Sequence, residues 1–211
     1  GVTVKTNVLF EEMKYNGVIV LKYKIEYPEF SSRLYKLAVS AVNKFYKSKA
    51  LEYQSYCRST LFKEAVKQYK YDVANGFPVR MFEAMTVFEM TYSKACVISL
   101  YSDKYEFTGG AHGNTVRTSQ TWNLQSASRI QLPQLFVCPF DYKEYILKQV
   151  SEQIKKNPSE YFDNYEKLIR EAFNEESFYC TPRGIVVYYQ QYDIAPYSSG
   201  IREFLIPYSR C

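Results

Sequence analysis

The chain has few of the residues from which common catalytic and metal sites are built. Its 211 residues include one histidine, and its five cysteines form no C-x-x-C pair. A single histidine without paired cysteines does not complete a common zinc site. The sequence also has no G-x-S-x-G elbow, H-E-x-x-H motif, Walker loop or dinucleotide fingerprint. We therefore expect no metal and no cofactor, and we favour a protein that is not an enzyme.

Long apolar runs and blocks of one charge are also missing. The longest apolar stretches, such as residues 17–21 and 185–189, fall far short of the roughly 18 residues that span a bilayer. The net charge of +5 is a mild excess, and Lys-Tyr pairs such as Lys14-Tyr15 and Lys70-Tyr71 are scattered. Nucleic-acid binding usually gathers Lys and Arg on one face. We expect no nucleic-acid partner, whereas an anionic cell-surface polymer remains compatible with the charge.

The first third of the chain predicts a hairpin followed by a long helix. Residues 2–12 and 18–27 have strand patterns, and Asn16-Gly17 between them is a strong type I′ turn signal. We expect Pro28 to end the second strand. Apolar residues then recur at near-helical spacing from the candidate N-cap Ser31 to Asn75-Gly76, which closes the helix.

The rest of the chain alternates strands with two shorter helical segments. Residues 79–124 show the apolar–polar alternation of an antiparallel sheet with one solvated face. Two helix-start patterns follow, and Pro207 places the last strand at a sheet edge. The predicted fold class is α+β: an antiparallel sheet with one long helix and two shorter helices packed against it. We expect an N-terminal half, residues 1–124, and a C-terminal half, residues 125–211, that together form one compact unit.

One segment, residues 108–114 with the sequence TGGAHGN, invites a functional interpretation. Glycines around the only histidine would expose the imidazole of His112 as a base or a metal ligand. The same glycines also mark places that need a positive φ or a close approach of backbones. His112 therefore has three interpretations: it fixes the connection, contacts a ligand, or takes part in catalysis.

Two longer signatures indicate a family. Residues 105–114 resemble the pattern Y-x-x-T-G-G-A-H-G-N, and residues 187–200 resemble V-Y-F-x-x-Y-E-I-A-P-Y-A-x-G. Both belong to a bacterial extracytoplasmic family that includes the RsiV-like anti-sigma factor ectodomains and the non-catalytic domain of PdaC-type peptidoglycan deacetylases. The chain is thus similar to domains of unknown function of the DUF3298 and DUF4163 types.

The resemblance implies an extracytoplasmic binding or sensing domain, either secreted or the ectodomain of a protein with a membrane anchor outside this chain. Its partner would be a protein or a peptidoglycan-like cell-wall polymer. A lysozyme-like ligand fits the resemblance, but the net charge of +5 argues against a strongly basic partner. The candidate binding residues lie in loops on a rigid sheet, where recognition is common: Gly109, Gly110, His112 and Asn114 in the first signature, and Tyr192, Asp193, Pro196 and Tyr197 in the second.

The alternative is an enzyme that processes cell-wall sugars with His112 and a carboxylate such as Asp193. The cysteines do not decide the compartment, because their odd number leaves the disulfide pairing open: they are Cys57, Cys96, Cys138, Cys180 and Cys211.

Overall fold

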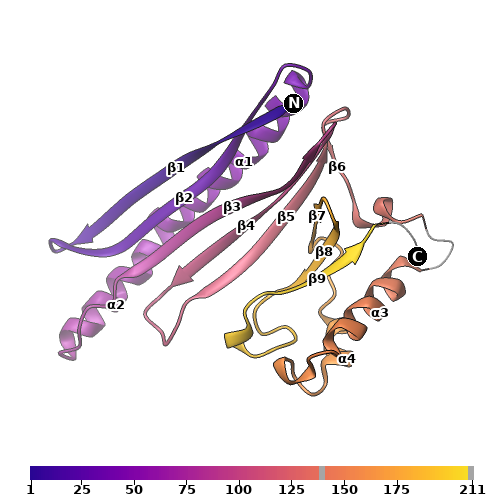
Figure 1. Cartoon of the computed structure of the whole chain (residues 1–211). Helices are drawn as coiled ribbons and strands as arrows, with labels where there is room; N and C mark the ends of the chain where they lie inside the picture. Colours follow the sequence, from indigo (N-terminus) through magenta and orange to yellow (C-terminus); the bar gives the residue numbers. More distant parts are fainter. Residues whose placement is uncertain (138–140, 209–211) are drawn as a thin grey trace. The chain divides into compact units, whose positions relative to one another are not determined.

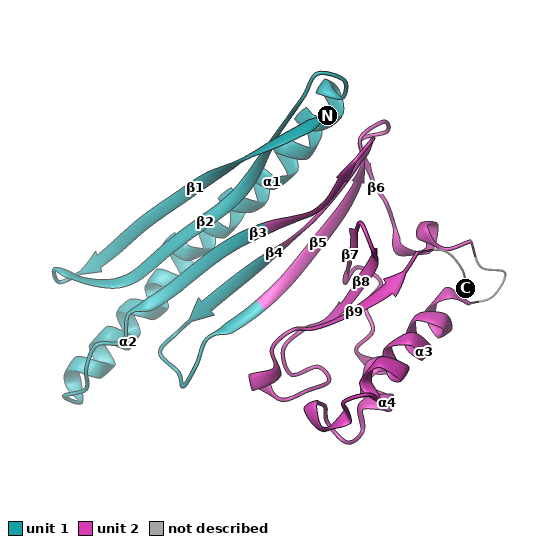
Figure 2. Cartoon of the chain, viewed as in Figure 1, with its two compact units in different colours: residues 1–88, 102–115 teal, residues 89–101, 116–211 magenta. Residues whose placement is uncertain are grey.

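The computed structural model describes residues 1–137 and 141–208. Cys138 and Cys211 lie outside the described residues, and the three described cysteines, Cys57, Cys96 and Cys180, are free thiols. The chain forms two compact units (Figure 2): unit 1 comprises residues 1–88 and 102–115, and unit 2 comprises residues 89–101 and 116–211. The division into halves at residue 124 stays a prediction.

Groups of strands and groups of helices follow one another along the chain, as Figure 1 shows. The elements are β1 (Val2–Tyr15), β2 (Val18–Ser32), α1 (Lys36–Tyr56), a π-helical segment (Cys57–Leu61), α2 (Phe62–Ala74), β3 (Phe82–Lys94), β4 (Val97–Phe107), β5 (Asn114–Asn123), β6 (Ser128–Arg129), a 3-10 turn (Leu132–Leu135), α3 (Tyr142–Ile154), a 3-10 turn (Pro158–Glu160), α4 (Tyr165–Glu171), β7 (Phe178–Thr181), β8 (Gly184–Tyr189), a 3-10 turn (Tyr197–Ser199) and β9 (Arg202–Pro207).

The α+β class is confirmed, but the expected purely antiparallel sheet is wrong. Within the described residues, one sheet has the order β1-β2-β3-β4-β5-β6, and a second has the order β7-β8-β9. Strands β1 and β2 pair antiparallel, whereas β2 and β3 run parallel, with residues 21–25 beside residues 82–86. The long helix causes this, because a strand that returns after a helical crossover pairs in the same direction as the strand before it.

The hairpin and the long helix follow the sequence signals at some ends and not at others. Asn16 and Gly17 have φ values of 50° and 74°, which confirms the type I′ signal. The helix ends at Asn75 and Gly76, as expected. Its expected start at Ser31 is wrong, because β2 continues past Pro28 to residue 32 and the helix begins at Lys36. Strand β3 pairs with β2 along residues 21–25, so Pro28 lies beyond this pairing, at an edge of the sheet where its missing N–H is tolerated.

Each unit is stabilised by its own apolar core. In unit 1, one face of the long helix packs on β2 and β3, where Leu21, Ile25 and Phe82 are almost fully buried. In unit 2, α3 packs through Ile146 and Val150 on the apolar strands β8 and β9. The first sequence signature runs from β4 to the start of β5, and the second runs from β8 toward β9.

Candidate functional site

Residues 108–114 connect β4 to β5 in unit 1, and two of their glycines have a structural reason: one has a left-handed backbone, and the other lies against an aromatic ring. Gly109 has a φ of 84°, in the left-handed region that side chains disfavour. A methyl group on Gly113 would lie 2.2 Å from the ring of Tyr105, so this ring packs directly against the glycine backbone. The expected positive φ is therefore present at Gly109, whereas the close neighbour of Gly113 is a side-chain ring and not the backbone of another strand.

A buried carboxylate anchors this loop to the end of the long helix. Arg80 donates one hydrogen bond to the carbonyl oxygen of Gly109 at 2.7 Å and another to Oδ1 of Asp72 at 2.8 Å. Gln68 donates to the same Oδ1 at 2.9 Å, and the Asp72 side chain is fully buried. The hydrogen bond from the Arg80 guanidinium is the main cause that lowers the pKa of Asp72. The charged carboxylate thus holds Arg80 in place, and Arg80 holds the loop.

The other candidate residues of this loop are exposed. Gly110, His112 and Asn114 all face solvent. The Nδ1 atom of His112 lies 3.0 Å from the carbonyl oxygen of Gly113, a contact within the loop itself. This contact orients the imidazole ring, and the roles of His112 in ligand contact and in catalysis stay predictions.

Sequence reasoning missed a polar cluster at the middle of the long helix. Tyr53 donates a hydrogen bond to Oε2 of Glu106 at 2.5 Å, and the Lys104 ammonium lies 4.3 Å from the centre of the Tyr53 ring. Cys57 opens the π-helical segment beside this cluster, and π segments are frequent at functional sites. Burial first, and then the charge of Glu106, raise the pKa of Cys57 to about 12. The thiol is therefore protonated at neutral pH and is a poor nucleophile.

The π-helical segment also connects the helix to the first hairpin. The Nε atom of Arg58 donates to Oε1 of Glu11 at 2.9 Å, and the Tyr23 hydroxyl donates to the same oxygen at 2.7 Å. The hydrogen bond from Tyr23, followed by that from Arg58, lowers the pKa of Glu11. These residues are far apart in sequence, so only the register of the hairpin and the packing of the helix bring them together.

In unit 2, the second signature is fixed to the neighbouring strand by one side-chain amide. Gln190 follows β8, and its Oε1 accepts a hydrogen bond from the backbone N–H of Arg117 at 2.9 Å. Its Nε2 donates to the carbonyl oxygen of Arg117 at 2.6 Å. Asp193 completes the turn, because its Oδ2 accepts from the backbone N–H of Gln190 at 3.0 Å. Burial raises the pKa of Asp193, while the Gln190 backbone hydrogen bond opposes that shift.

This loop holds two tyrosines at its surface. Tyr192 has a φ of 70°, a conformation that bulky side chains rarely adopt. Its side chain is 53% exposed, and its ring centre lies 5.6 Å from that of Tyr197. Ile194 and Ala195, which follow Asp193, are buried, and Pro196 is exposed. The buried pair and the Asp193 turn therefore impose the left-handed conformation on Tyr192.

A second polar cluster that the sequence did not reveal surrounds Arg117, the residue whose backbone is hydrogen-bonded to Gln190. The Arg117 guanidinium is only 7% exposed and lies 3.8 Å from the centre of the Tyr101 ring. It also forms an ion pair with Glu203 at 3.2 Å, and Tyr179 donates a hydrogen bond to the other Glu203 oxygen. Burial, followed by the Glu203 hydrogen bond, raises the pKa of Tyr179. The cluster joins β4, β5, β7 and β9, and it includes Arg117 of β5, whose backbone is hydrogen-bonded to the Gln190 side chain.

The structure groups the candidate residues by unit. Gly109, Gly110, His112 and Asn114 share one loop of unit 1, and Tyr192, Asp193, Pro196 and Tyr197 share one loop of unit 2. Within residues 1–137 and 141–208, no group of three or more His, Cys, Asp or Glu side chains is placed to hold a metal ion. Within the same residues, no helix combines the length and apolarity needed to cross a membrane.

Comparison with known proteins identifies two families along the chain. The family model described as deacetylase PdaC matches residues 18–115, and that of DUF3298, a protein of unknown function, matches residues 134–209. A solved DUF3298 protein from Bacteroides fragilis is 18% identical with a TM-score of 0.71, covering 98% of this chain and 90% of its own. A DUF3298 protein from Pseudomonas aeruginosa is 15% identical with a TM-score of 0.62, covering 97% and 91%. These two structures share the fold, and no curated protein matches the chain.

The contact between Gly113 and Tyr105 predicts a stability effect. Gly113→Ala should lower the free energy of unfolding by about 1–3 kcal/mol, because the added methyl group overlaps the Tyr105 ring. Gly110→Ala is the control, since the nearest atom to its methyl group is 4.0 Å away. In a Tyr105→Ala background the cost of Gly113→Ala should disappear. Denaturant unfolding of the four variants measures this, and an equal cost in both backgrounds would show that the ring is not the cause.

The Asp72–Arg80 pair predicts a pH dependence. The pKa of Asp72 is lower in the folded protein than in the unfolded chain. Its stabilising effect is therefore complete above the usual Asp pKa of about 4 and is lost as the pH falls through the lowered folded value. The difference in unfolding free energy between wild type and Asp72→Asn should be constant near neutral pH and shrink in acid. A difference that stays constant throughout the acid range would contradict this.

Proposed function

We propose that this chain, whose residues 18–115 match the PdaC family model and whose residues 134–209 match the DUF3298 family model, is an extracytoplasmic domain that recognises a ligand without catalysing a reaction. The ligand is a protein or a polymer of the cell envelope. The extracytoplasmic location and the sensing role rest on the resemblance to RsiV-like ectodomains. The observation that carries the binding role is the strained, exposed Tyr192.

The strain at Tyr192 supports recognition because a turn alone does not need a tyrosine. Glycine or asparagine adopts a φ near 70° at little cost, whereas a bulky residue there costs on the order of 1–3 kcal/mol. Tyr192 is half exposed, so burial of its ring in the core does not offset this cost. Strained residues of this kind concentrate at ligand-binding sites, where the surrounding structure holds them in place.

The remaining signature residues support the same role by fixing the loops. The Gln190 amide bonds the backbone of Arg117, and the Asp193 carboxylate accepts a hydrogen bond from the backbone N–H of Gln190. In the other loop, the carbonyl oxygen of Gly109 accepts a hydrogen bond from Arg80. A loop that is already ordered loses little entropy when it binds, and rigid aromatic side chains are frequent anchors of protein interfaces. Tyr192 and Tyr197 would be the anchors on one loop, and His112 and Asn114 would be exposed contacts on the other.

The experiment that tests this role is Tyr192→Gly. Glycine relieves the strain of the left-handed backbone but is freer in the unfolded chain, so these two effects oppose each other and the free energy of unfolding should stay within about 1 kcal/mol of wild type. Binding to purified peptidoglycan sacculi or to lysozyme, measured by pull-down and calorimetry, should fall about tenfold or more through loss of the anchor. Tyr71→Ala is the matched control, since Tyr71 is similarly exposed on α2, and it should bind as wild type does.

Three results would overturn the proposal. The first is that neither sacculi nor lysozyme binds the wild-type chain, and the second is that Tyr192→Gly binds unchanged. The third is turnover: release of acetate or of new reducing ends from sacculi, abolished by His112→Ala or Asp193→Asn without a change in melting temperature, would favour the sugar-processing enzyme.

A further inference from the structure

The positive charge of the chain is concentrated just before α1 and along it. Residues 30–51 contain five basic residues and no acidic one, so this segment alone carries the net charge of +5. The other 22 basic residues are balanced by the 22 acidic residues of the chain, all of which lie outside this segment. All five cations are exposed: Arg33, Lys36, Lys44, Lys47 and Lys49.

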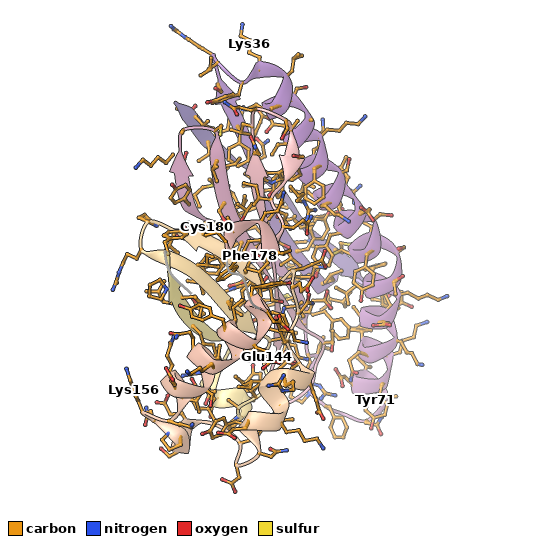
Figure 3. The ribbon with its side chains drawn as sticks, turned by 90° about the vertical axis from the view of Figure 1, so that its right-hand side faces the viewer. Lys36, Tyr71, Glu144, Lys156, Phe178 and Cys180 are labelled. Carbon is orange, nitrogen blue, oxygen red and sulfur yellow. The ribbon has the colours of Figure 1, made fainter. Side chains whose placement is uncertain are left out.

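Two leucines are exposed at the same end of this helix. Leu34 is 76% exposed and Leu37 is 89% exposed, although the helix buries other apolar residues, such as Val39 and Val42, against the sheet of unit 1. The core therefore does not use these leucines. Figure 3 shows Lys36, between the two leucines in sequence, at one end of the long helix and Tyr71 near the other.

We propose that this surface, defined by Arg33, Leu34, Lys36, Leu37, Lys44 and Lys47, docks on an anionic lipid bilayer. Interfacial helices combine exposed lysines, which attract anionic headgroups, with apolar side chains that enter the boundary between headgroups and acyl chains. Each cation near such a surface strengthens binding about fivefold at moderate salt. The two leucines at the helix start supply the apolar contact, and the cations before and along α1 supply the attraction.

The leucines favour a bilayer over a soluble polyanion. A polyanion such as heparin or nucleic acid is attracted by the cations, but it offers no apolar layer into which Leu34 and Leu37 would transfer. Exposed leucines beside clustered cations are typical of surfaces that bind membranes. This inference concerns unit 1 and is independent of the recognition role proposed for Tyr192.

Co-sedimentation with lipid vesicles tests this inference. The wild-type chain should bind vesicles of phosphatidylglycerol and phosphatidylcholine, and should not bind vesicles of phosphatidylcholine alone. Lys44→Gln/Lys47→Gln should weaken binding roughly tenfold or more through lost attraction. Leu34→Ser/Leu37→Ser should also weaken it by about tenfold or more, without change in the salt dependence, because only apolar contact is lost.

Matched controls separate this surface from general effects. Lys148→Gln/Lys156→Gln removes the same charge from exposed sites in unit 2, and Val73→Ser removes an exposed apolar residue at the far end of the long helix. Both controls, and Tyr192→Gly, should bind vesicles as wild type does. The lysine, leucine and valine variants should keep the wild-type melting temperature because their altered side chains are exposed. Failure of the wild type to bind anionic vesicles would overturn the proposal. So would Leu34→Ser/Leu37→Ser binding vesicles and heparin as wild type does, a result that would identify a soluble polyanion as the ligand.

Discussion

The loops of this protein depend on one constraint: backbone N–H and carbonyl groups need hydrogen-bond partners, and at several positions polar side chains from other parts of the chain provide them. Gln190 satisfies both the N–H and the carbonyl of Arg117. Asn43 of α1 does the same for Phe30 in β2, through hydrogen bonds of 2.7 and 2.9 Å. Arg80, held by the buried Asp72, satisfies the carbonyl of Gly109. Where these partners are present, the loop has one conformation and its outward side chains have fixed positions.

This constraint explains why polar residues of the two signatures act mainly within the structure. The amide of Gln190 and the carboxylate of Asp193 are directed at backbone atoms, and Gly109 and Gly113 give the backbone the conformation and space it needs. The side chains that remain at the surface are aromatic or weakly polar, as at Tyr192 and Asn114. A surface of this composition is suited to recognition, which is the role that we propose for the domain.

The sequence predicted features set by neighbouring residues and missed those set by distant ones. The turn at Asn16-Gly17 and the helix end at Asn75-Gly76 form as expected, because the positive φ of Asn16, Gly17 and Gly76 is a local property of these residues. The parallel pairing of β2 with β3 was missed because apolar alternation does not encode strand direction. Pro28 did not end its strand, since the cost of a proline depends on the neighbouring strand.

For the candidate sites, too, the sequence predicted the local segments and missed the distant residues that contact them. The family signatures located both loops, but the partners Asp72, Arg80 and Arg117 carry no sequence signal because packing alone brings them to the loops. The cations of α1 were also overlooked, since they are spaced along a helix and not adjacent in sequence. The left-handed conformation of Tyr192 has no signal either, as tyrosine is unfavourable there.

Amide hydrogen exchange at Arg117 and Gln190 tests most directly whether the second loop is held rigid before any ligand binds. The account predicts strong protection of both amides in the free protein, with protection at Arg117 lost in Gln190→Ala because the side-chain acceptor is removed. Exchange of both amides at the rate of an unstructured peptide in the wild-type chain would contradict it.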